Sequence, residues 1–359
     1  MSGLLTLRDG IPRFAAKVRA REPVTIVAFG TSMTLFGQYL ARLPAALEAA
    51  THGAPIRLVN RGLRGFMTFA AAFRVAADVL PQVPDLVLIE FAHNDAAGAA
   101  VEAIAPALDG MVEQVRRVSS GCDFAFVYLA QAGAAAGGPT AAMTAYERVA
   151  AYHRFPSFDL ATLSERLVAA GTVGWTGDGT PALTYDGVHH TALAEELLGQ
   201  PFAAAFVDLL HASTAVPGPP RPVSDRSLSG AWRAPASRSL GSGSWGVGLP
   251  HNHDSRNAQA YEDDVAEALA PEATLVVPFE GSRVLAWVMG SGTVRVSLEG
   301  WAEQRLLDVA ASRAWNLVDL SPALPGGSYV LHVTVLEPPV VFGDIYVIGT
   351  PLPDRPARG

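Results

Sequence analysis

Hydrophobic positions follow two different patterns along this chain. From about Val24 to Leu209, short apolar blocks without a period of two alternate with stretches in which apolar residues recur at helical spacing. The apolar blocks predict strands at Val24–Phe29, Ile56–Asn60, Leu86–Phe91 and Phe124–Leu129, with a shorter strand near Phe158. Strands that are apolar throughout are typical of a parallel sheet covered on both faces.

Helices are predicted between these strands, at Leu40–Ala50, Ala99–Val118, Ala141–Tyr152 and Ala192–Leu209. This alternation with short connections predicts a doubly wound, flavodoxin-like α/β domain over residues 1–212. A Pro-rich stretch follows and predicts a linker at 213–230, because proline cannot continue a helix.

The pattern in residues 231–359 is that of strands alone. Its apolar segments, bounded by Gly, Pro, Asp or Ser, are TLVVPF, RVLAWVM, TVRVSLE, NLVDL, SYVLHVTVL and VVFGDIYVIG. Short strands at this spacing predict an antiparallel β-sandwich of jelly-roll type. Residues 227–271 are less regular, and the sequence contains no internal repeat.

Composition narrows the classes of function. The formal net charge is −8 and no Lys/Arg cluster occurs, so no nucleic-acid partner is expected. No apolar run reaches the roughly 18 residues of a membrane span, so no membrane partner is expected either. The N-terminal segment has no basic and apolar signal pattern, which predicts a cytoplasmic protein. The single cysteine, Cys122, excludes an intrachain disulfide and is expected to be buried as a small apolar residue.

Residues suited to catalysis follow the predicted strands. Ser32 comes after the first strand in Gly30-Thr31-Ser32, at the sheet edge where α/β folds bind ligands, although Gly-x-Ser is by itself a common turn. The second strand is followed by a glycine-containing segment that ends at Gly65, and the third by Asn94. A glycine lets a backbone N–H approach a reacting centre, and an Asn amide can donate to an oxyanion.

The segment YDGVHH, residues 185–190, places an acid three residues before an imidazole. Across a turn, Asp186 can accept the Nδ1 proton of His189 and leave Nε2 facing a serine. This spacing selects His189 over its neighbour His190 as the base.

These four blocks, in this order, resemble those of the SGNH or GDSL-like hydrolases over about Val24 to Leu209. The resemblance implies that Ser32 is the nucleophile, that Asp186 and His189 complete a triad, and that Ser32, Gly65 and Asn94 supply the oxyanion donors. Two blocks depart from the family's usual Gly-Asp-Ser and Gly-x-Asn-Asp: here they read Gly-Thr-Ser and, at residues 92–95, Ala-His-Asn-Asp. Both departures affect neighbours of the matched residues, so they bear on substrate preference more than on activity.

Other candidate positions have competing interpretations. His93 is a candidate substrate contact, or else a histidine packed at a strand end. Asp95 is expected to anchor its loop through backbone N–H groups. Trp245, in GSGSWGVG, is a candidate sugar-stacking residue, or else a buried one. The motif HNHD at 251–254 lacks the spacing of a zinc site, so we predict no metal, and the absence of Gly-rich phosphate loops predicts no nucleotide cofactor.

The leading interpretation is therefore a serine esterase that removes small acyl groups, acetyl above all, from a carbohydrate. The carbohydrate is implied by the resemblance, since SGNH domains joined to jelly-roll modules look like carbohydrate esterases. Two alternatives stay open: a lipid or small-ester hydrolase that the β-domain shields, and a glycan-binding protein without activity. The sequence leaves the oligomeric state open.

Overall fold

The computed structural model describes residues 3–133, 138–177, 180–213, 221, 227–248 and 265–350, without the side chains of residues 310–316 and 350. The chain divides into two compact units, Met1–Ser229 and Gly230–Gly359, which we call unit 1 and unit 2. This division falls at the C-terminal end of the predicted linker.

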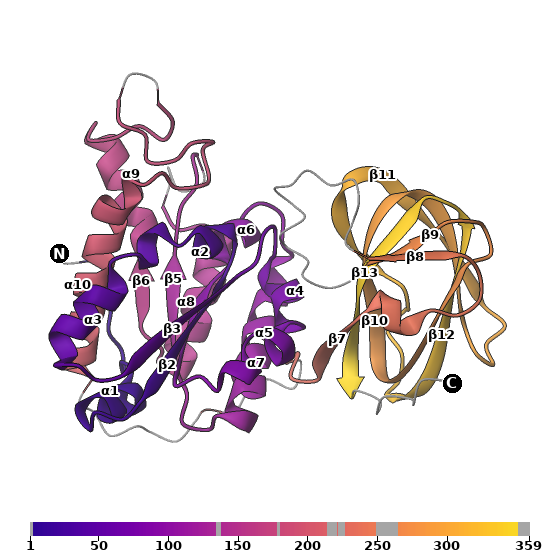
Figure 1. Cartoon of the computed structure of the whole chain (residues 1–359), viewed down its shortest axis with the longest axis horizontal. Coiled ribbons are helices and arrows are strands. Elements are labelled where there is room, and N and C mark those ends of the chain that lie inside the picture. The colour runs from indigo at the N-terminus through magenta and orange to yellow at the C-terminus, as the bar shows by residue number, and fades with distance from the viewer. Residues whose placement is uncertain are drawn as a thin grey trace. The chain divides into compact units, whose positions relative to one another are not determined.

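Unit 1 is built around a six-stranded sheet with the order β1-β6-β5-β4-β2-β3 (Figure 1). All neighbouring pairs are parallel except β1 with β6. Every residue of β4 and β5 is buried, which explains why these segments are apolar without alternation. The strands are β1 (Leu5–Thr6), β2 (Val24–Gly30), β3 (Ile56–Gly62), β4 (Leu86–Glu90), β5 (Asp123–Tyr128) and β6 (Ser157–Asp159).

Helices cover both faces of this sheet, as Figure 1 shows. On one face α1, α3 and α10 share a core with Ile26, Ala28 and Leu88 of the strands. On the other face α7 packs against α8, and the ring of Phe126 in β5 meets that of Tyr146 at 5.1 Å. The helices are α1 (Pro12–Arg19), α2 (Ser32–Phe36), α3 (Leu43–Thr51), α4 (Thr68–Ala72), α5 (Val75–Asp78), α6 (Ala92–Asp95), α7 (Val101–Val118), α8 (Ala141–His153), α9 (Leu160–Ala169) and α10 (Gln200–Ala212), with 3₁₀ segments η1 (Gln38–Leu40) and η2 (Leu80–Gln82). The predicted doubly wound α/β fold is confirmed.

Strand order sets the position of the site. β3 pairs with β2 on one side, and β4, which comes later in the chain, pairs with β2 on the other side. The carboxyl ends of β2 and β4 therefore flank the topological switch point, where open α/β sheets bind ligands.

Several helical segments differ from the sequence prediction; α1, α4 and α5, for example, were not predicted. The helix predicted over 192–209 is interrupted by a π-helical turn, η3 (Glu195–Gly199), before α10 begins. Pro201 explains the break, because it has no N–H to continue the helical ladder. Helix α9 was not predicted; it is capped by Asp159, whose carboxylate accepts the N–H of Thr162 at 2.9 Å.

Unit 2 is an antiparallel β-structure, as predicted. Its strands are β7 (Ala231–Pro235), β8 (Trp245–Gly248), β9 (Val265–Ala268), β10 (Thr274–Leu298), β11 (Gln304–Asp319), β12 (Gly327–Glu337) and β13 (Val340–Thr350), with a 3₁₀ turn η4 (Ala236–Ser239). The first and last parts of β10 both pair with β12, so the sheet curls round on itself. Figure 1 shows the resulting curled sheet.

Three segments that the sequence suggested as separate strands form the single long strand β10. Glycines in this strand lie where the neighbouring backbone is too close for a side chain. A Cβ at Gly290 would lie 2.2 Å from the carbonyl oxygen of Pro339, and a Cβ at Gly292 would lie 1.9 Å from the carbonyl oxygen of Glu337. Turn-like residues here mark close backbone approach rather than chain reversal. The irregular region 227–271 also contains three short strands, β7, β8 and β9, that were not predicted.

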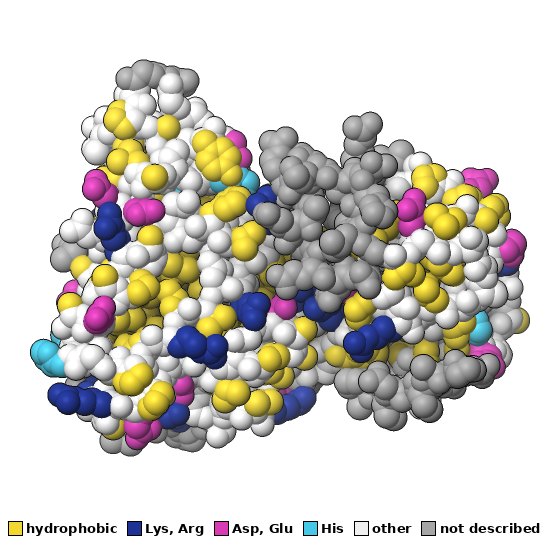
Figure 2. Space-filling model, in the orientation of Figure 1, with side chains coloured by type: hydrophobic (Ala, Val, Ile, Leu, Met, Phe, Trp, Pro, Cys, Tyr) yellow, Lys and Arg dark blue, Asp and Glu magenta, His cyan; other side chains and the backbone are white. Residues whose placement is uncertain are grey.

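Charged side chains are dispersed on the face of the molecule that Figure 2 draws. Figure 2 shows Lys and Arg side chains on this face as small separate groups between hydrophobic and acidic ones. Cys122 is 1% exposed, which confirms its predicted burial. Within the described residues, no helix is both long and apolar enough to cross a membrane.

Candidate active site

The candidate nucleophile lies immediately after β2. Thr31 precedes α2 as its N-cap, with its hydroxyl accepting the N–H of Met33 at 3.2 Å, and Ser32 is the first helical residue. Ser32 is only 6% exposed.

The candidate acid and base come from a tight loop at residues 184–190, a few residues before η3 begins. Thr184 and His190 form an isolated antiparallel bridge that closes the loop, and Gly187 adopts φ = +87°, which a glycine tolerates without strain. The hydroxyl of Thr184 accepts the N–H of Gly187 at 3.1 Å. The closed turn holds the Asp186 and His189 side chains on the same side.

A continuous chain of hydrogen bonds links the three predicted catalytic residues. His189 Nδ1 donates to Asp186 Oδ2 at 2.6 Å, and Nε2 lies 2.9 Å from Ser32 Oγ. The backbone N–H groups of Val188 and His189 donate to Asp186 Oδ1 at 3.0 and 2.7 Å. Partial burial opposes ionisation of Asp186, but the hydrogen bonds from His189 and Val188 outweigh it and hold the pKa of this carboxyl below its ordinary value. An ionised Asp186 keeps the proton on Nδ1, so Nε2 is left to accept from Ser32.

Aromatic rings that sequence reasoning did not single out surround the imidazole. The ring of Phe36 meets that of His189 edge-on at 5.2 Å, and Arg64 covers Phe36 at 4.9 Å. Tyr185 stacks on His189 at 5.5 Å with an angle of 17° between the rings, and it is 60% exposed. Both aromatic neighbours lie within four sequence positions of a predicted catalytic residue. This proximity is the sequence feature that could have identified them as parts of the site.

Gly65 and Asn94, the candidate oxyanion donors, lie after β3 and β4. Gly65 is exposed with φ = +70°, and a Cβ there would meet no atom within 4 Å, so its conformation rather than its space favours glycine. Asn94 Nδ2 donates one hydrogen to the carbonyl of Phe66 at 2.9 Å, which ties the two segments together and leaves the second amide hydrogen available.

Asp95 anchors this segment, as expected. Its Oδ1 accepts the backbone N–H of Thr68 at 2.9 Å, and its Oδ2 accepts the Thr68 hydroxyl. Burial outweighs these hydrogen bonds and raises the pKa of Asp95 to about 6.

The two histidines beside the candidate residues are buried. His93 has a side chain only 1% exposed; Nδ1 lies 2.8 Å from Glu90 and Nε2 lies 3.4 Å from Thr31. The predicted substrate contact for His93 disagrees with this burial, because α6 turns the ring inward behind the nucleophile. His190 is 2% exposed, and neither ring nitrogen has a hydrogen-bond partner within the described residues.

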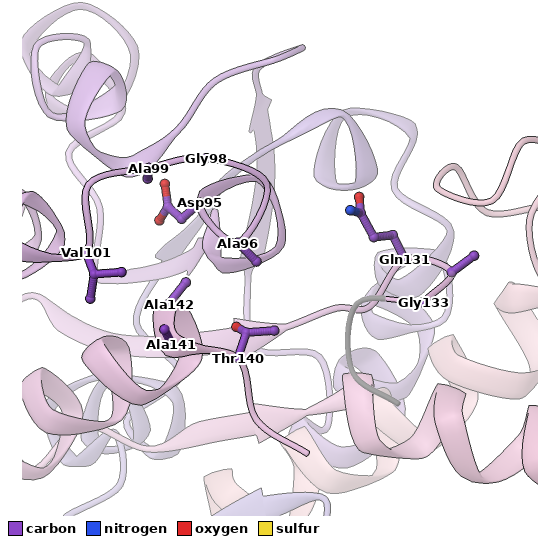
Figure 3. A pocket seen from close by; sticks show the side chains of 11 residues that line it. Asp95, Ala96, Gly98, Ala99, Val101, Gln131, Gly133, Thr140, Ala141 and Ala142 are labelled. Carbon is purple, nitrogen blue, oxygen red and sulfur yellow. The ribbon is translucent and has the colours of Figure 1, made fainter. Parts of the chain in front are cut away.

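A pocket of about 400 Å³ is lined by residues that follow β4 and β5, Asp95 and Gln131 among them (Figure 3). Asp95, Gln131 and Thr140 are among the polar residues that line it, together with several alanines. The N–H of Ala132 in its wall donates to the carbonyl of Gly187 at 2.7 Å, which joins the pocket to the loop that carries the candidate base.

Trp245 does not form the predicted exposed platform. It lies in β8, partly buried against the core of unit 2, with its ring 6.3 Å from that of Phe342 and its Nε1 donating to Ser242 at 3.3 Å. Trp301 is 43% exposed instead.

The motif at 251–254 lies outside the described residues, and the part of the chain that the structure describes contains no group of three or more His, Cys, Asp or Glu residues able to hold a metal ion.

A model of the GDSL-like lipase/acylhydrolase family matches residues 15–197, slightly more than half of the chain. The chain belongs to this family. It is an ester hydrolase of the SGNH type, and the match covers Ser32, Gly65, Asn94, Asp186 and His189. A comparison with curated proteins finds no match.

Solved structures resemble the chain over both units. A two-domain esterase (CEX) active on acetylated mannans, co-crystallised with mannopentaose, is 16% identical with a TM-score of 0.78, and 98% of each chain is covered. A second structure of that esterase gives 16% identity, a TM-score of 0.76 and coverage of 97% of this chain and 100% of the other. The acetylxylan esterase Axe2 from Geobacillus stearothermophilus is 16% identical with a TM-score of 0.42, over 51% of this chain and 94% of its own. The similarity to the two CEX structures supports an α/β unit followed by a β unit.

Proposed function

We propose that this hydrolase is a serine esterase that removes small acyl groups, acetyl in particular, from a carbohydrate. The observation that carries the proposal is the hydrogen-bonded chain from Asp186 through His189 to Ser32, with distances of 2.6 and 2.9 Å. Within this arrangement the serine hydroxyl has a base in hydrogen-bond contact, and the base has an orienting acid.

In the first half of the reaction, Ser32 Oγ attacks the ester carbonyl carbon and passes its proton to His189 Nε2. The resulting oxyanion accepts hydrogen bonds from the Ser32 and Gly65 backbone N–H groups and from the free hydrogen of the Asn94 amide. The tetrahedral intermediate collapses, the C–O bond to the alcohol breaks, and His189 returns its proton to the departing alkoxide oxygen. The alcohol leaves, and the acyl group remains on Ser32.

Water completes the reaction by the same path. His189 takes a proton from the water as its oxygen attacks the acyl carbon, and the same donors hold the second oxyanion. The bond to Ser32 Oγ then breaks, and the serine oxygen regains a proton from His189. Asp186 stays ionised throughout and stabilises the imidazolium that forms in each half.

Three observations support a carbohydrate as the alcohol. The overall similarity extends through both units to an esterase active on acetylated mannans. Beside the base, Tyr185 presents an exposed aromatic ring, a surface on which the C–H face of a sugar can stack. The neighbouring pocket of about 400 Å³ combines alanines with the polar Gln131 and Thr140, so it suits a polar ring better than a long alkyl chain.

The test compares three substrates. Acetate release from an acetylated mannooligosaccharide and hydrolysis of p-nitrophenyl acetate should both be rapid, and a long-chain p-nitrophenyl ester should be a poor substrate. Preference for the long-chain ester, with no release from the oligosaccharide, would identify a lipid or small-ester hydrolase. Absence of turnover with all three, in folded protein, would favour a glycan-binding protein without activity.

A further inference from the structure

A buried carboxylate lies directly behind the candidate nucleophile, and the reaction described above does not use it. Glu90 is the last residue of β4 and is fully buried. Its Oε2 accepts three hydrogen bonds, from the Thr31 backbone N–H at 3.1 Å, the Thr31 hydroxyl at 2.9 Å and the Thr34 hydroxyl at 2.8 Å. Its Oε1 lies 2.8 Å from His93 Nδ1. Four donors therefore converge on one carboxylate, which satisfies its charge without water.

The end of β2 is shaped to admit this carboxylate. Gly30 and Glu90 are paired across the parallel strands β2 and β4. A Cβ at Gly30 would lie 2.8 Å from Glu90 Oε2 and 2.1 Å from Thr34 Oγ1, too close for either atom to remain in place. Glycine at this position is thus required by the side chain of Glu90 as well as by the Thr34 hydroxyl and the Glu90 carbonyl, which a Cβ would approach to 2.1 and 2.7 Å.

The hydrogen-bond directions connect Glu90 to the serine. Because the Thr31 hydroxyl gives its only hydrogen to Glu90, its oxygen is left to accept the N–H of Met33 and cap α2. The Thr31 backbone N–H is shared between the Glu90 backbone carbonyl at 3.0 Å and the Glu90 carboxylate at 3.1 Å. Both ends of Thr31 are therefore fixed, and Ser32 follows it directly with Oγ 2.9 Å from His189 Nε2.

We propose that Glu90 is the positioning residue of the nucleophile turn: its carboxylate, supplied by the neighbouring strand, holds Thr31 and so orients Ser32 toward His189. The usual Gly-Asp-Ser block carries a carboxylate beside the serine, and Thr31 provides none here. The inference rests on the proposed function, because it assigns Glu90 a role in the reaction of Ser32.

The first test removes the acceptor at similar volume. Glu90→Met should lower kcat on p-nitrophenyl acetate by about 10²-fold and change KM by less than about threefold, because a misoriented nucleophile slows the chemical step more than binding. Glu90→Gln keeps one oxygen for the Thr31 donors and should recover most of kcat. The rate constant for inactivation by a fluorophosphonate should fall in parallel with kcat.

A matched control separates positioning from stability. Asp109 and His153 form another buried acid–histidine pair, with Oδ1 2.8 Å from Nε2, on α7 and α8. Asp109→Leu should lower the melting temperature and leave kcat of the folded protein unchanged. Folded Glu90→Met with wild-type kcat, or Asp109→Leu with an equal loss of kcat, overturns the proposal.

A second test moves the carboxylate and does not require Glu90→Met to fold. Thr31→Asp alone places two buried carboxylates together, so at about pH 8 it should lower kcat by at least about tenfold. Adding Glu90→Gln to Thr31→Asp should raise kcat again, because one carboxylate then caps α2 and accepts from the amide. If the second substitution lowers kcat further, Glu90 does not have the proposed role.

The results that would overturn the proposed function differ from those that would overturn the positioning role of Glu90. A wild type that neither hydrolyses acetyl esters nor reacts with the fluorophosphonate at Ser32 overturns that function, and this inference with it. A wild type that does both, beside a fully active Glu90→Met, overturns the positioning role alone.

Discussion

Replacing His190 by leucine should make unit 1 more resistant to acid. His190 is 2% exposed, and within the described residues neither ring nitrogen has a hydrogen-bond partner. Burial lowers the pKa of His190 to about 4; the neighbouring His93 and His189 act in the same direction, and Glu90 acts against them. The imidazole is therefore neutral in the folded state over a pH range in which the unfolded chain carries it protonated.

The magnitude follows from the two pKa values. A histidine in the unfolded chain has a pKa near 6.5, so below that pH the unfolded state binds more protons and the free energy of unfolding falls. The stabilisation is present above pH 6.5 and is lost progressively as the pH falls through about 4. Between about pH 7 and pH 5 the loss attributable to His190 is about 2 kcal/mol. Leucine does not titrate, so His190→Leu should escape this loss.

Other buried groups oppose this trend in the wild type. Burial raises the pKa of both Asp95 and Asp123 to about 6, so the folded state takes up protons before the unfolded state and gains stability as the pH falls toward 4. These carboxyls are the same in wild type and variant. The difference between the two proteins therefore isolates His190.

The assay is urea denaturation of both proteins at about pH 7 and pH 5, followed by helical circular dichroism. All described α-helices lie in unit 1, so this signal reports on the unit that contains His190. The difference in free energy of unfolding should move by about 2 kcal/mol in favour of His190→Leu at the lower pH. His211→Leu, on the exposed side of α10, is the control. An identical difference at both pH values would refute the account of His190 as a neutral buried imidazole.

Three further predictions concern the reaction. Asn94→Ala should lower kcat on an acetyl ester by about 10²–10³, the loss expected for one oxyanion donor, and an unchanged kcat would remove Asn94 from the oxyanion site. Asp186→Ala and His189→Ala should each reduce kcat severely, and the double variant should be little slower than the worse single one; additive losses would mean that the two act independently. Tyr185→Ala should raise KM for an acetylated oligosaccharide more than for p-nitrophenyl acetate, whereas Tyr185→Phe should behave like wild type; equal effects on both substrates would contradict a sugar contact.

Much of the candidate site could be predicted because parallel strands share their direction. Residues that follow β2, β3 and β4 must meet at one sheet edge, so an ordered series of strand-end residues is also a spatial cluster. The structure places Ser32, His189 and Asp186 in hydrogen-bond contact from segments up to 157 positions apart. The spacing of Asp186 and His189 also distinguished the histidine that faces Ser32 from the buried His190.

Glu90 could not be identified in the same way. It ends a strand that reads as apolar, and hydrophobic patterning does not reveal which strand residue faces the turn after a neighbouring strand. The same limit explains His93, whose ring follows the inward turn of α6 rather than the strand. Gly62 at the end of β3 and Gly65 just after it look equivalent in sequence, yet a Cβ at Gly62 would lie 2.1 Å from the Leu35 nitrogen, whereas Gly65 has open space around it.

Unit 2 could be predicted in class and only partly in detail. Glycines at bends were interpreted as strand ends, although the pairing of both ends of β10 with β12 keeps the strand continuous. Trp245, in a Gly/Ser-rich segment, was a candidate either for sugar stacking or for burial, and its pairing with Ala268 across β8 and β9 directs it onto the core of the unit. Tertiary pairing, which local composition does not encode, decided both cases.

The central claim, that Ser32 is the nucleophile of an acyl-transfer site, is tested most directly by covalent labelling. Wild-type protein treated with a fluorophosphonate should carry a single adduct, located on Ser32 by peptide mass spectrometry, and should lose acetyl-esterase activity in proportion to the labelling. Ser32→Ala should retain the wild-type melting temperature, take up no label and show no acetyl-ester turnover above background. An adduct on another residue, or near wild-type turnover by Ser32→Ala, would contradict the account.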